Sequence, residues 1–404
     1  MKRLGLTMFA IMMALIPALA QKNIQWRGEN RTGVYDESGL MKQWPADGLK
    51  MLWHYDQLGE GYSSVAIAND KIYVNGMKDG QQGWLTVLDL NGNMLRQVNY
   101  GQEWKGNYSG ARGAVTVNDG LIFIESGFGV LYCLIEGTLE TLWKKDLVNE
   151  LGGEMIKFAM NEVPLIIDNK VIATVGGKLH NIVALNKLTG ELIWSTPANG
   201  DIAAYCSPIF VDDVNIPQII TFTAHSVVGV NPVNGTMLWS YPWSDRWDTH
   251  ANSPLYSDGM IMCTSGNSTG SLMLRLDKSG TKVTKVWENK SIENGYSGIV
   301  KYGNEVYGYN ESRHQFACLD WNTGNQLWTG RIAQAVPILA DDMMYLYTGT
   351  GEVLLVKPDK TKLDIVSRQK ITLGEEQHWA HPVIYKGVLY VRHGYSLMAF
   401  DIEQ

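Results

Sequence analysis

The sequence predicts an all-β fold, an eight-bladed β-propeller of four-stranded blades whose ring is closed by an N-terminal strand completing the last blade. Three observations lead to this prediction. An eleven-residue pattern recurs along the chain, short alternating runs fill the intervals between its copies, and the final unit stops one strand short while a lone strand lies near the N-terminus. Short strands at regular spacing are typical of ring-shaped β architectures.

The recurring pattern is clearest at residues 184–194, 229–239 and 318–328. Each copy starts on a small residue, places a glycine six positions later and ends on a tryptophan ten positions later, as in Gly190 and Trp194. Glycine supplies the positive φ that hairpin turns need, and tryptophan anchors a buried strand. The pattern therefore indicates a strand end, a tight turn and the start of the next strand.

The alternating runs group into units of four strands, separated by turn residues such as Asn69-Asp70 and Ser257-Asp258-Gly259. The first seven units close at positions 98, 143, 194, 239, 287, 328 and 366, with spacings of about 38 to 51 residues. That spacing matches one four-stranded propeller blade. A helical solenoid is excluded because no unit carries a long stretch of helical period.

The two ends of the chain complete each other. The eighth unit opens at Pro382 and stops at Gln404, where its turn and fourth strand should follow. The lone strand from Met51 to Tyr55 supplies that missing strand and protects the sheet edges. The tryptophans expected to dock each closing strand onto the next blade are Trp53, Trp143, Trp194, Trp239, Trp287 and Trp328.

The first 20 residues predict an export signal, with Lys2 and Arg3 before an apolar stretch and Ala18-Leu19-Ala20 as the cleavage site. We therefore expect residues 1–20 to be a signal peptide, 21–49 an N-terminal cap segment and 50–404 the propeller. The protein is expected to be exported to the periplasm or the extracellular space. It would be soluble there, without a lipid-bearing cysteine or a transmembrane segment after cleavage.

Charge and cysteine content narrow the function classes. The net charge of −7 and the lack of a Lys/Arg cluster argue against nucleic acid as a partner. The four cysteines have no spacing typical of zinc, and we expect all four to be reduced and structural. His250, His378 and His381 come from units well apart in the ring, so no metal site is predicted.

The repeated spacing, Ala-x-Asn/Asp-x-x-Thr-Gly-x-x-x-Trp, resembles the tryptophan-docking motif of the pyrroloquinoline-quinone-like (PQQ-like) β-propeller repeats. The resemblance covers Met51 to Gln404, and the opening Gln25-Trp-Arg-Gly-x-Asn-Arg-x-Gly33 is similar to the start of many exported bacterial members. One branch of this family contains quinoprotein alcohol and sugar dehydrogenases. Another contains the outer-membrane assembly factor BamB, a non-catalytic scaffold.

The resemblance is better to the assembly-factor branch in length and blade count. None of the dehydrogenase catalytic residues can be matched to a position here. The resemblance to the dehydrogenases would also imply a disulfide between two adjacent cysteines, and no two cysteines are adjacent in this sequence. We therefore expect no catalytic residues, no cofactor, and an envelope protein, small molecule or glycan as partner. The alternatives are a PQQ-dependent dehydrogenase, which would need PQQ with calcium, and a carbohydrate-binding propeller.

Polar and aromatic residues precede the first strands of the units, where a propeller has the mouth of its channel. Convergent polar and aromatic groups in a concavity are typical of a ligand site. The candidate ligand-binding residues are Tyr62, Arg112, Asn161, Tyr205, His250, Asn252, Tyr296 and His381. The alternative is that they bond to neighbouring blades and ordered water.

The connection from Ser240 to Ser253 is the one richest in aromatic and charged side chains. Its candidate partner-binding residues are Trp243, Arg246, Trp247 and Asp248. Aromatic residues and arginine are typical of protein-binding hot spots and of platforms that stack sugars. The alternative is a loop whose tryptophans are buried over the channel.

Overall fold

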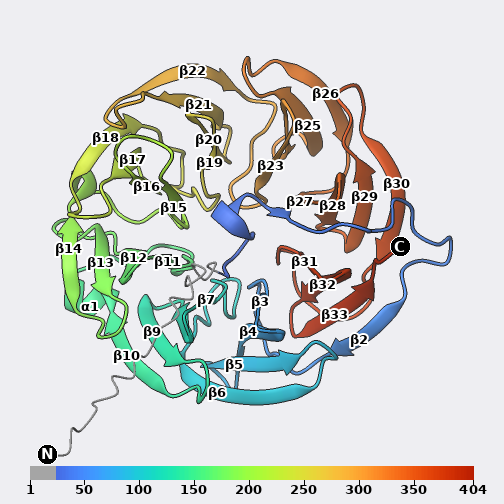
Figure 1. Cartoon of the computed structure of the whole chain (residues 1–404), viewed down its shortest axis with the longest axis horizontal. Helices are drawn as coiled ribbons and strands as arrows, with labels where there is room; N and C mark the ends of the chain where they lie inside the picture. The colour runs from blue at the N-terminus through green and yellow to red at the C-terminus, as the bar shows by residue number, and fades with distance from the viewer. Residues whose placement is uncertain (1–23) are drawn as a thin grey trace, which may run out of the picture.

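The computed structural model describes residues 24–404, which form eight radial sheets around a central axis (Figure 1). The eight-bladed propeller predicted from the sequence is confirmed. The predicted signal peptide, residues 1–20, lies outside the described residues. Of the helices in the described part of the chain, none has the length and apolarity to span a membrane.

Each of the first four blades is one antiparallel sheet built from consecutive strands, innermost strand first. The strands are β3 (Ala66–Ala68), β4 (Lys71–Lys78), β5 (Gln82–Asp89) and β6 (Met94–Gln102) in blade one; β7 (Thr116–Asn118), β8 (Leu121–Glu125), β9 (Val130–Ile135) and β10 (Thr141–Asp146) in blade two; β11 (Leu165–Ile167), β12 (Lys170–Thr174), β13 (Ile182–Asn186) and β14 (Leu192–Thr196) in blade three; and β15 (Ile209–Val211), β16 (Gln218–Thr223), β17 (Ser226–Val230) and β18 (Met237–Pro242) in blade four.

The remaining blades follow the same order, and two of them recruit a strand from the N-terminal segment. The strands are β19 (Leu255–Ser257), β20 (Met260–Ser265), β21 (Gly270–Leu276) and β22 (Val283–Asn289) in blade five; β23 (Ile299–Tyr302), β24 (Glu305–Asn310), β25 (Gln315–Asp320) and β26 (Gln326–Arg331) in blade six; β27 (Ala335–Ala340), β28 (Met343–Thr348), β29 (Glu352–Lys357), β30 (Asp364–Lys370) and β1 (Val34–Tyr35) in blade seven; and β31 (Val383–Tyr385), β32 (Val388–His393), β33 (Ser396–Asp401) and β2 (Met51–Tyr55) in blade eight.

Strand β2 closes the ring as the outermost strand of blade eight. It pairs antiparallel with β33, with Trp53 opposite Ala399 in the register. Three short helices complete the described chain: η1 (Glu29–Arg31), α1 (Leu147–Leu151) and η2 (Ala198–Gly200). The predicted closure is confirmed, because the sheet order β2-β33-β32-β31 joins both ends of the chain.

The tryptophans of the closing strands lock each blade onto the next. The ring N–H of Trp194 in β14 donates to the carbonyl of Pro232 in the next blade over 3.0 Å. A Cβ atom on Gly235, whose φ is +75°, would lie only 2.5 Å from that ring, so only glycine admits the close approach. Trp53, Trp143, Trp287 and Trp328 likewise donate to carbonyls of the following blade.

Trp239 reaches the following blade indirectly. Its ring N–H donates to the side-chain oxygen of Gln218 over 2.5 Å, and the amide of Gln218 donates to the carbonyl of Gly280 over 3.2 Å. The β21–β22 turn that carries Gly280 spans 277–282, which is six residues, as in the β17–β18 turn at 231–236. Gln218 therefore bridges the ring of Trp239 and the turn of the next blade.

The core lies between the blades, where both faces of the middle strands are buried. Strands such as β16, β20 and β28 are buried along their whole length, because a blade packs on either side of them. The outermost strands alternate instead, with their solvent-facing positions exposed. All four cysteines are free and buried in these interfaces.

The first described residues fill the central channel (Figure 1). Ile24 forms an antiparallel bridge with Val117 of β7, and β1 then pairs in parallel with β27. The segment thus runs up the channel beside one innermost strand, turns through η1 near the axis and returns beside another. We call residues 24–35 the channel plug.

Candidate functional site

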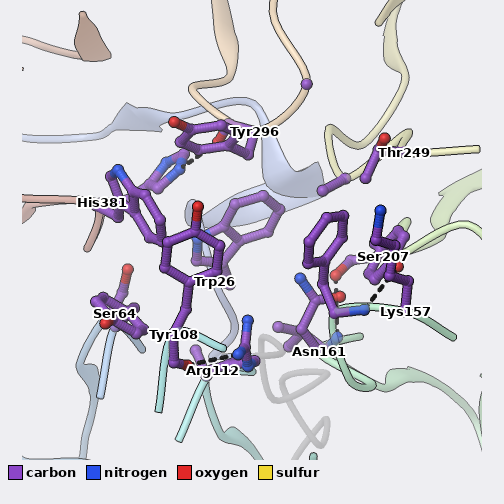
Figure 2. A pocket seen from close by; sticks show the side chains of 18 of the residues that line it. Trp26, Ser64, Tyr108, Arg112, Lys157, Asn161, Ser207, Thr249, Tyr296 and His381 are labelled. Carbon is purple, nitrogen blue, oxygen red and sulfur yellow. Dashed lines mark hydrogen bonds between the residues drawn. The ribbon is translucent and has the colours of Figure 1, made fainter. Parts of the chain in front are cut away.

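A cavity of about 530 Å³ occupies the channel mouth, on the face where the innermost strands begin (Figure 2). Its wall comes from residues that precede β3, β7, β11, β15, β19, β23 and β31, including Ser64, Val163 and Ser207. Trp26 of the channel plug also lines it. The plug therefore turns an open channel into a cup with a floor.

Arg27 fixes the floor of the cup beneath Trp26. Its guanidinium donates to the carbonyls of Ile299 and Pro337 over 2.7 and 3.2 Å, and to Nδ1 of His381 over 2.9 Å. Because Nε2 of His381 lies 3.1 Å from the carbonyl oxygen of Tyr296, which can only accept, Nε2 carries the proton and Nδ1 accepts. Burial and the adjacent Arg27 hold the pKa of His381 well below its ordinary value, so this histidine is neutral.

Arg31 ties the other side of the plug to blade three. Its guanidinium donates to the carbonyls of Val163 and Pro164 over 2.7 and 3.3 Å. Both plug arginines are almost fully buried and bind carbonyls rather than carboxylates. Burial accordingly lowers the pKa of each guanidinium to about 10. The plug is thus held by specific bonds to blades on opposite sides of the channel.

Aromatic rings make up much of the cavity wall. Trp379 has its ring centre 5.1 Å from Tyr62, 4.8 Å from Tyr108 and 5.4 Å from Tyr296. The wall continues from Tyr108 to Phe158 at 6.4 Å, and Phe158 packs against Tyr205 at 6.2 Å. With Trp26 and Trp247, eight aromatic side chains line this one cavity. Such a surface binds apolar faces and ring edges.

Two cations face the cavity without a carboxylate partner within ion-pair distance among the described residues. Arg112 donates to the carbonyls of Asn107 and Tyr108, and Lys157 lies 4.3 Å from the ring centre of Trp247. Behind Arg112, Glu103 accepts from Tyr100 and Gly127, and burial raises its pKa to about 7. Arg112 and Lys157 therefore give the cavity a positive character within a net acidic protein.

Glu311 is the one carboxylate in the cavity wall. It accepts from the backbone N–H of Gly295 over 2.9 Å. Burial raises the pKa of Glu311 to about 7, and the neighbouring carboxylates of Glu293 and Asp245 add to this shift. At neutral pH the Glu311 side chain is thus only partly charged.

Three polar atoms in the wall are buried and have no hydrogen-bond partner among residues 24–404. They are Oγ of Ser64, Oδ1 of Asn161 and Nε of Arg112. A buried polar atom without a hydrogen bond is costly, and such atoms at a cavity are satisfied by water or by a ligand. They mark where a polar ligand would be recognised.

A second cavity of about 240 Å³ adjoins the first. Lys157, Tyr205 and Trp247 line both, while Arg246 and Asp248 line only the smaller one. The guanidinium of Arg246 lies 5.0 Å from the ring centre of Trp247. Trp247 therefore stands between the two cavities.

The structure brings together six of the eight ligand-binding residues predicted from the sequence. The residues that line the main cavity are Tyr62, Arg112, Asn161, Tyr205, Tyr296 and His381. They come from six blades and meet because each one precedes an innermost strand.

His250 and Asn252 are corrections, since both side chains are buried behind the wall. His250 stacks on Phe222 at 4.8 Å, and burial lowers its pKa. Asn252 donates to Asn294 and accepts from the N–H of Gly298. Successive side chains of extended backbone alternate, and here Thr249 and Ala251 take the cavity side instead.

The four partner-loop residues divide in a similar way. Arg246, Trp247 and Asp248 line the cavities, whereas Trp243 packs against the core between blades four and five. Sequence reasoning missed Lys157, Phe158 and Trp379 as cavity residues. For Trp379 a signal was present, because it precedes His381 by two positions and so lies on the same side of the chain.

The cavity does not fit calcium with a bound quinone. Calcium takes six to eight oxygen ligands, but Glu311 is the only carboxylate in the wall. Asp245 and Glu293 nearby are engaged by Ser265, Ser268 and Ser312. In the described residues, no three His, Cys, Asp or Glu side chains gather in a way that could hold a metal ion, and no cysteine lines the cavity.

Comparison with protein families gives one match. The family model described as outer membrane protein assembly factor BamB matches residues 78–330. No curated protein matches the sequence.

Comparison with solved structures shows the fold. BamB from Moraxella catarrhalis has a TM-score of 0.64 at 15% identity, covering 87% of this chain and 99% of its own. A europium-containing methanol dehydrogenase has a TM-score of 0.68 at 12% identity, covering 90% and 88%. The quinohemoprotein alcohol dehydrogenase from Comamonas testosteroni has a TM-score of 0.64 at 11% identity, covering 94% and 80%. At these identities both kinds of protein share only the architecture.

Proposed function

Because this chain belongs to the family of the outer membrane protein assembly factor BamB, we propose that it is a non-catalytic binding propeller whose ligand enters the cup at the channel mouth. The observation that carries the proposal is the channel plug. Trp26 and Arg27 close the channel from within, and the wall above them is rich in aromatic rings and poor in acid–base groups. A cavity that is closed at one end and lined by aromatic rings is suited to hold a ligand.

The scaffold is suited to this role because the ring holds the cup rigid. Six blades contribute the predicted cavity residues, and the plug bonds to blades on opposite sides of the channel. Little has to be ordered when a ligand arrives, which lowers the entropic cost of binding. The ligand remains separate from the outer rim, where the docking tryptophans lie.

We also propose export, on the evidence of residues 1–20. Edman sequencing of the protein from envelope extract should then begin at Gln21. A mature chain that retains Lys2 and Arg3 would contradict this proposal.

A second candidate is a PQQ-dependent dehydrogenase. Glu311 favours it, since a cavity carboxylate with a pKa of about 7 can exchange protons near neutral pH. Against it stands the lack of fit to calcium. In such an enzyme Glu311 would be the residue available to accept a proton.

The deciding experiment is a titration of the protein with PQQ and calcium, followed by absorbance and by thermal unfolding. The proposed function predicts no stoichiometric binding and no dye-linked oxidation of alcohols or sugars. Oxidation that is lost in Glu311→Gln but kept in Glu352→Gln, a change at a half-buried position at the start of β29 that does not line the cavity, would establish the dehydrogenase instead.

A further inference from the structure

We propose that the two adjoining cavities bind the end of a linear acidic oligosaccharide, a chain of pyranose units carrying carboxylate or sulfate groups. The inference rests on the proposed function, namely that the cup is a ligand site. It adds the class of ligand and the path the ligand follows. Three independent features of the cavities point to this chemistry.

The first feature is the arrangement of rings. Trp379 lies at the centre of a cluster with Tyr62, Tyr108 and Tyr296. The ring of Tyr108 lies 6.4 Å from that of Phe158, which packs against Tyr205, so the rings form one continuous wall. Pyranose rings present C–H faces that pack on aromatic rings, while their hydroxyls point outward at the edges. A continuous aromatic wall can therefore pack against the face of a sugar unit.

The second feature is the set of unpaired polar atoms. Oγ of Ser64 and Oδ1 of Asn161 are buried acceptors, and Nε of Arg112 is a buried donor. A purely apolar ligand would leave all three unsatisfied on displacing water, which would cost affinity. Hydroxyl groups both donate and accept, so a sugar can satisfy all three atoms at once.

The third feature is charge. Arg112, Lys157 and Arg246 face the cavities, and none has a carboxylate within ion-pair distance in residues 24–404. Two acids offset part of this charge: Asp248 lines the smaller cavity, and Glu311 in the main cavity carries only part of its charge near neutral pH. Three unpaired cations in a chain of net charge −7 favour an anionic ligand.

The second cavity indicates a chain rather than a single sugar. It shares Lys157, Tyr205 and Trp247 with the main cavity and extends the site toward Arg246. A ligand whose end fills the cup would pass over Trp247, whose side chain is 47% exposed, into the smaller cavity. The plug blocks continuation in the other direction, so the site recognises a chain end.

The test is calorimetric titration of the full propeller chain with galacturonate oligomers of increasing length and with sulfated galactan oligomers, which carry sulfate but no carboxylate. These two arms separate carboxylate from sulfate as the source of the charge. The matched neutral probes are methyl-esterified galacturonate oligomers and unsulfated galactan oligomers. We expect at least one acidic series to bind about tenfold or more tightly than its neutral partner, with affinity rising from one unit to three.

Two variants locate the site. Lys157→Gln should weaken the acidic probe about tenfold and leave the neutral probe unchanged, whereas Lys360→Gln, an exposed charge on the β29–β30 turn, should change neither. Trp247→Ala should remove the gain in affinity with chain length but keep binding of the shortest probe. Thermal unfolding of each variant checks that it is folded.

Equal affinity for acidic and neutral probes, or failure of both acidic series to bind, would overturn the inference. A neutral sugar or a peptide that binds in the cup more tightly than both acidic series would do the same, while leaving the proposed function intact. PQQ-dependent oxidation would instead contradict the proposed function, so the two failures are distinguishable.

Discussion

The tryptophans of this propeller fall into two regions that differ in kind. At the outer rim, Trp194 is 8% exposed, its ring N–H is bonded and its face lies on a glycine of the next blade. At the channel mouth, Trp247 is 47% exposed and lies between two cavities. The rim tryptophans recur at a fixed place in the repeat, and those of the mouth do not. Periodic tryptophans thus hold the scaffold, whereas the tryptophans that line the main cavity, Trp26, Trp247 and Trp379, all lie outside the repeated position.

Truncation of a tryptophan at the outer rim should have the largest effect, which is a loss of folding stability. Trp194→Ala removes a buried ring and leaves a cavity between blades three and four, which should lower the free energy of unfolding by about 3 kcal/mol. Chemical denaturation would measure this loss. Affinity for an acidic oligosaccharide should remain unchanged in the folded fraction, and a loss of affinity without a loss of stability would refute the division into two regions.

The glycine beneath the docked ring gives the next largest effect. Gly235→Ala combines a positive φ with a Cβ atom 2.5 Å from Trp194, whereas Gly120→Ala has a similar φ of +73° but open space around it. The first variant should therefore lose about 1 to 3 kcal/mol more stability than the second. Equal losses in the two variants would show that backbone strain alone, and not ring docking, explains the glycine.

Truncation of a tryptophan at the channel mouth should lower ligand affinity more than stability. Trp379→Ala removes the ring that contacts Tyr62, Tyr108 and Tyr296. We expect the affinity for an acidic oligosaccharide to fall about tenfold, while stability changes by less than about 2 kcal/mol. Titration calorimetry and thermal unfolding on the same sample would compare the two. Unfolding as severe as that of Trp194→Ala would assign Trp379 to the scaffold.

The smallest effect concerns pH. Glu311 is neutral below its pKa of about 7 and charged above it, so an anionic ligand should bind more weakly as pH rises. Asp245 and Glu293 face Glu311 as carboxylates, and the phenols of Tyr296 and Tyr309 have raised pKa values and stay neutral. Affinity should fall about fivefold from about pH 6 to about pH 8.

The matched variant isolates the source of this pH dependence. Glu311→Gln keeps the shape of the side chain and removes its titration, so affinity should become flat over the same range. A slope that persists in Glu311→Gln would assign the pH dependence to another group.

The fold could be predicted because its determinants repeat. The turn glycine and the closing tryptophan recur at one spacing, so they fix the blade, the number of blades and the role of β2 as the closing strand. The channel plug could not be foreseen. Residues 24–35 show no period, and nothing in their sequence indicates that Arg27 and Arg31 are buried in bonds to carbonyls across the ring.

The sequence predicted which stretches of the chain meet at the site, but not which of their side chains face the cavity. In a ring of blades, the residues that precede the innermost strands meet at the channel mouth. This rule placed Tyr62, Arg112 and Tyr296 in the cavity. Which side of an extended connection faces inward depends on contacts far away in the sequence. His250 therefore points away while its neighbour Thr249 points in.

The most direct test of the central claim is a crystal structure of the full chain with a trigalacturonate or a sulfated galactan oligomer. We predict one sugar unit against Trp379, an acidic group close to Arg112 or Lys157, and the chain passing over Trp247. Ligand density at the outer rim near Trp194 and Gly235, with an empty cup, would contradict the account.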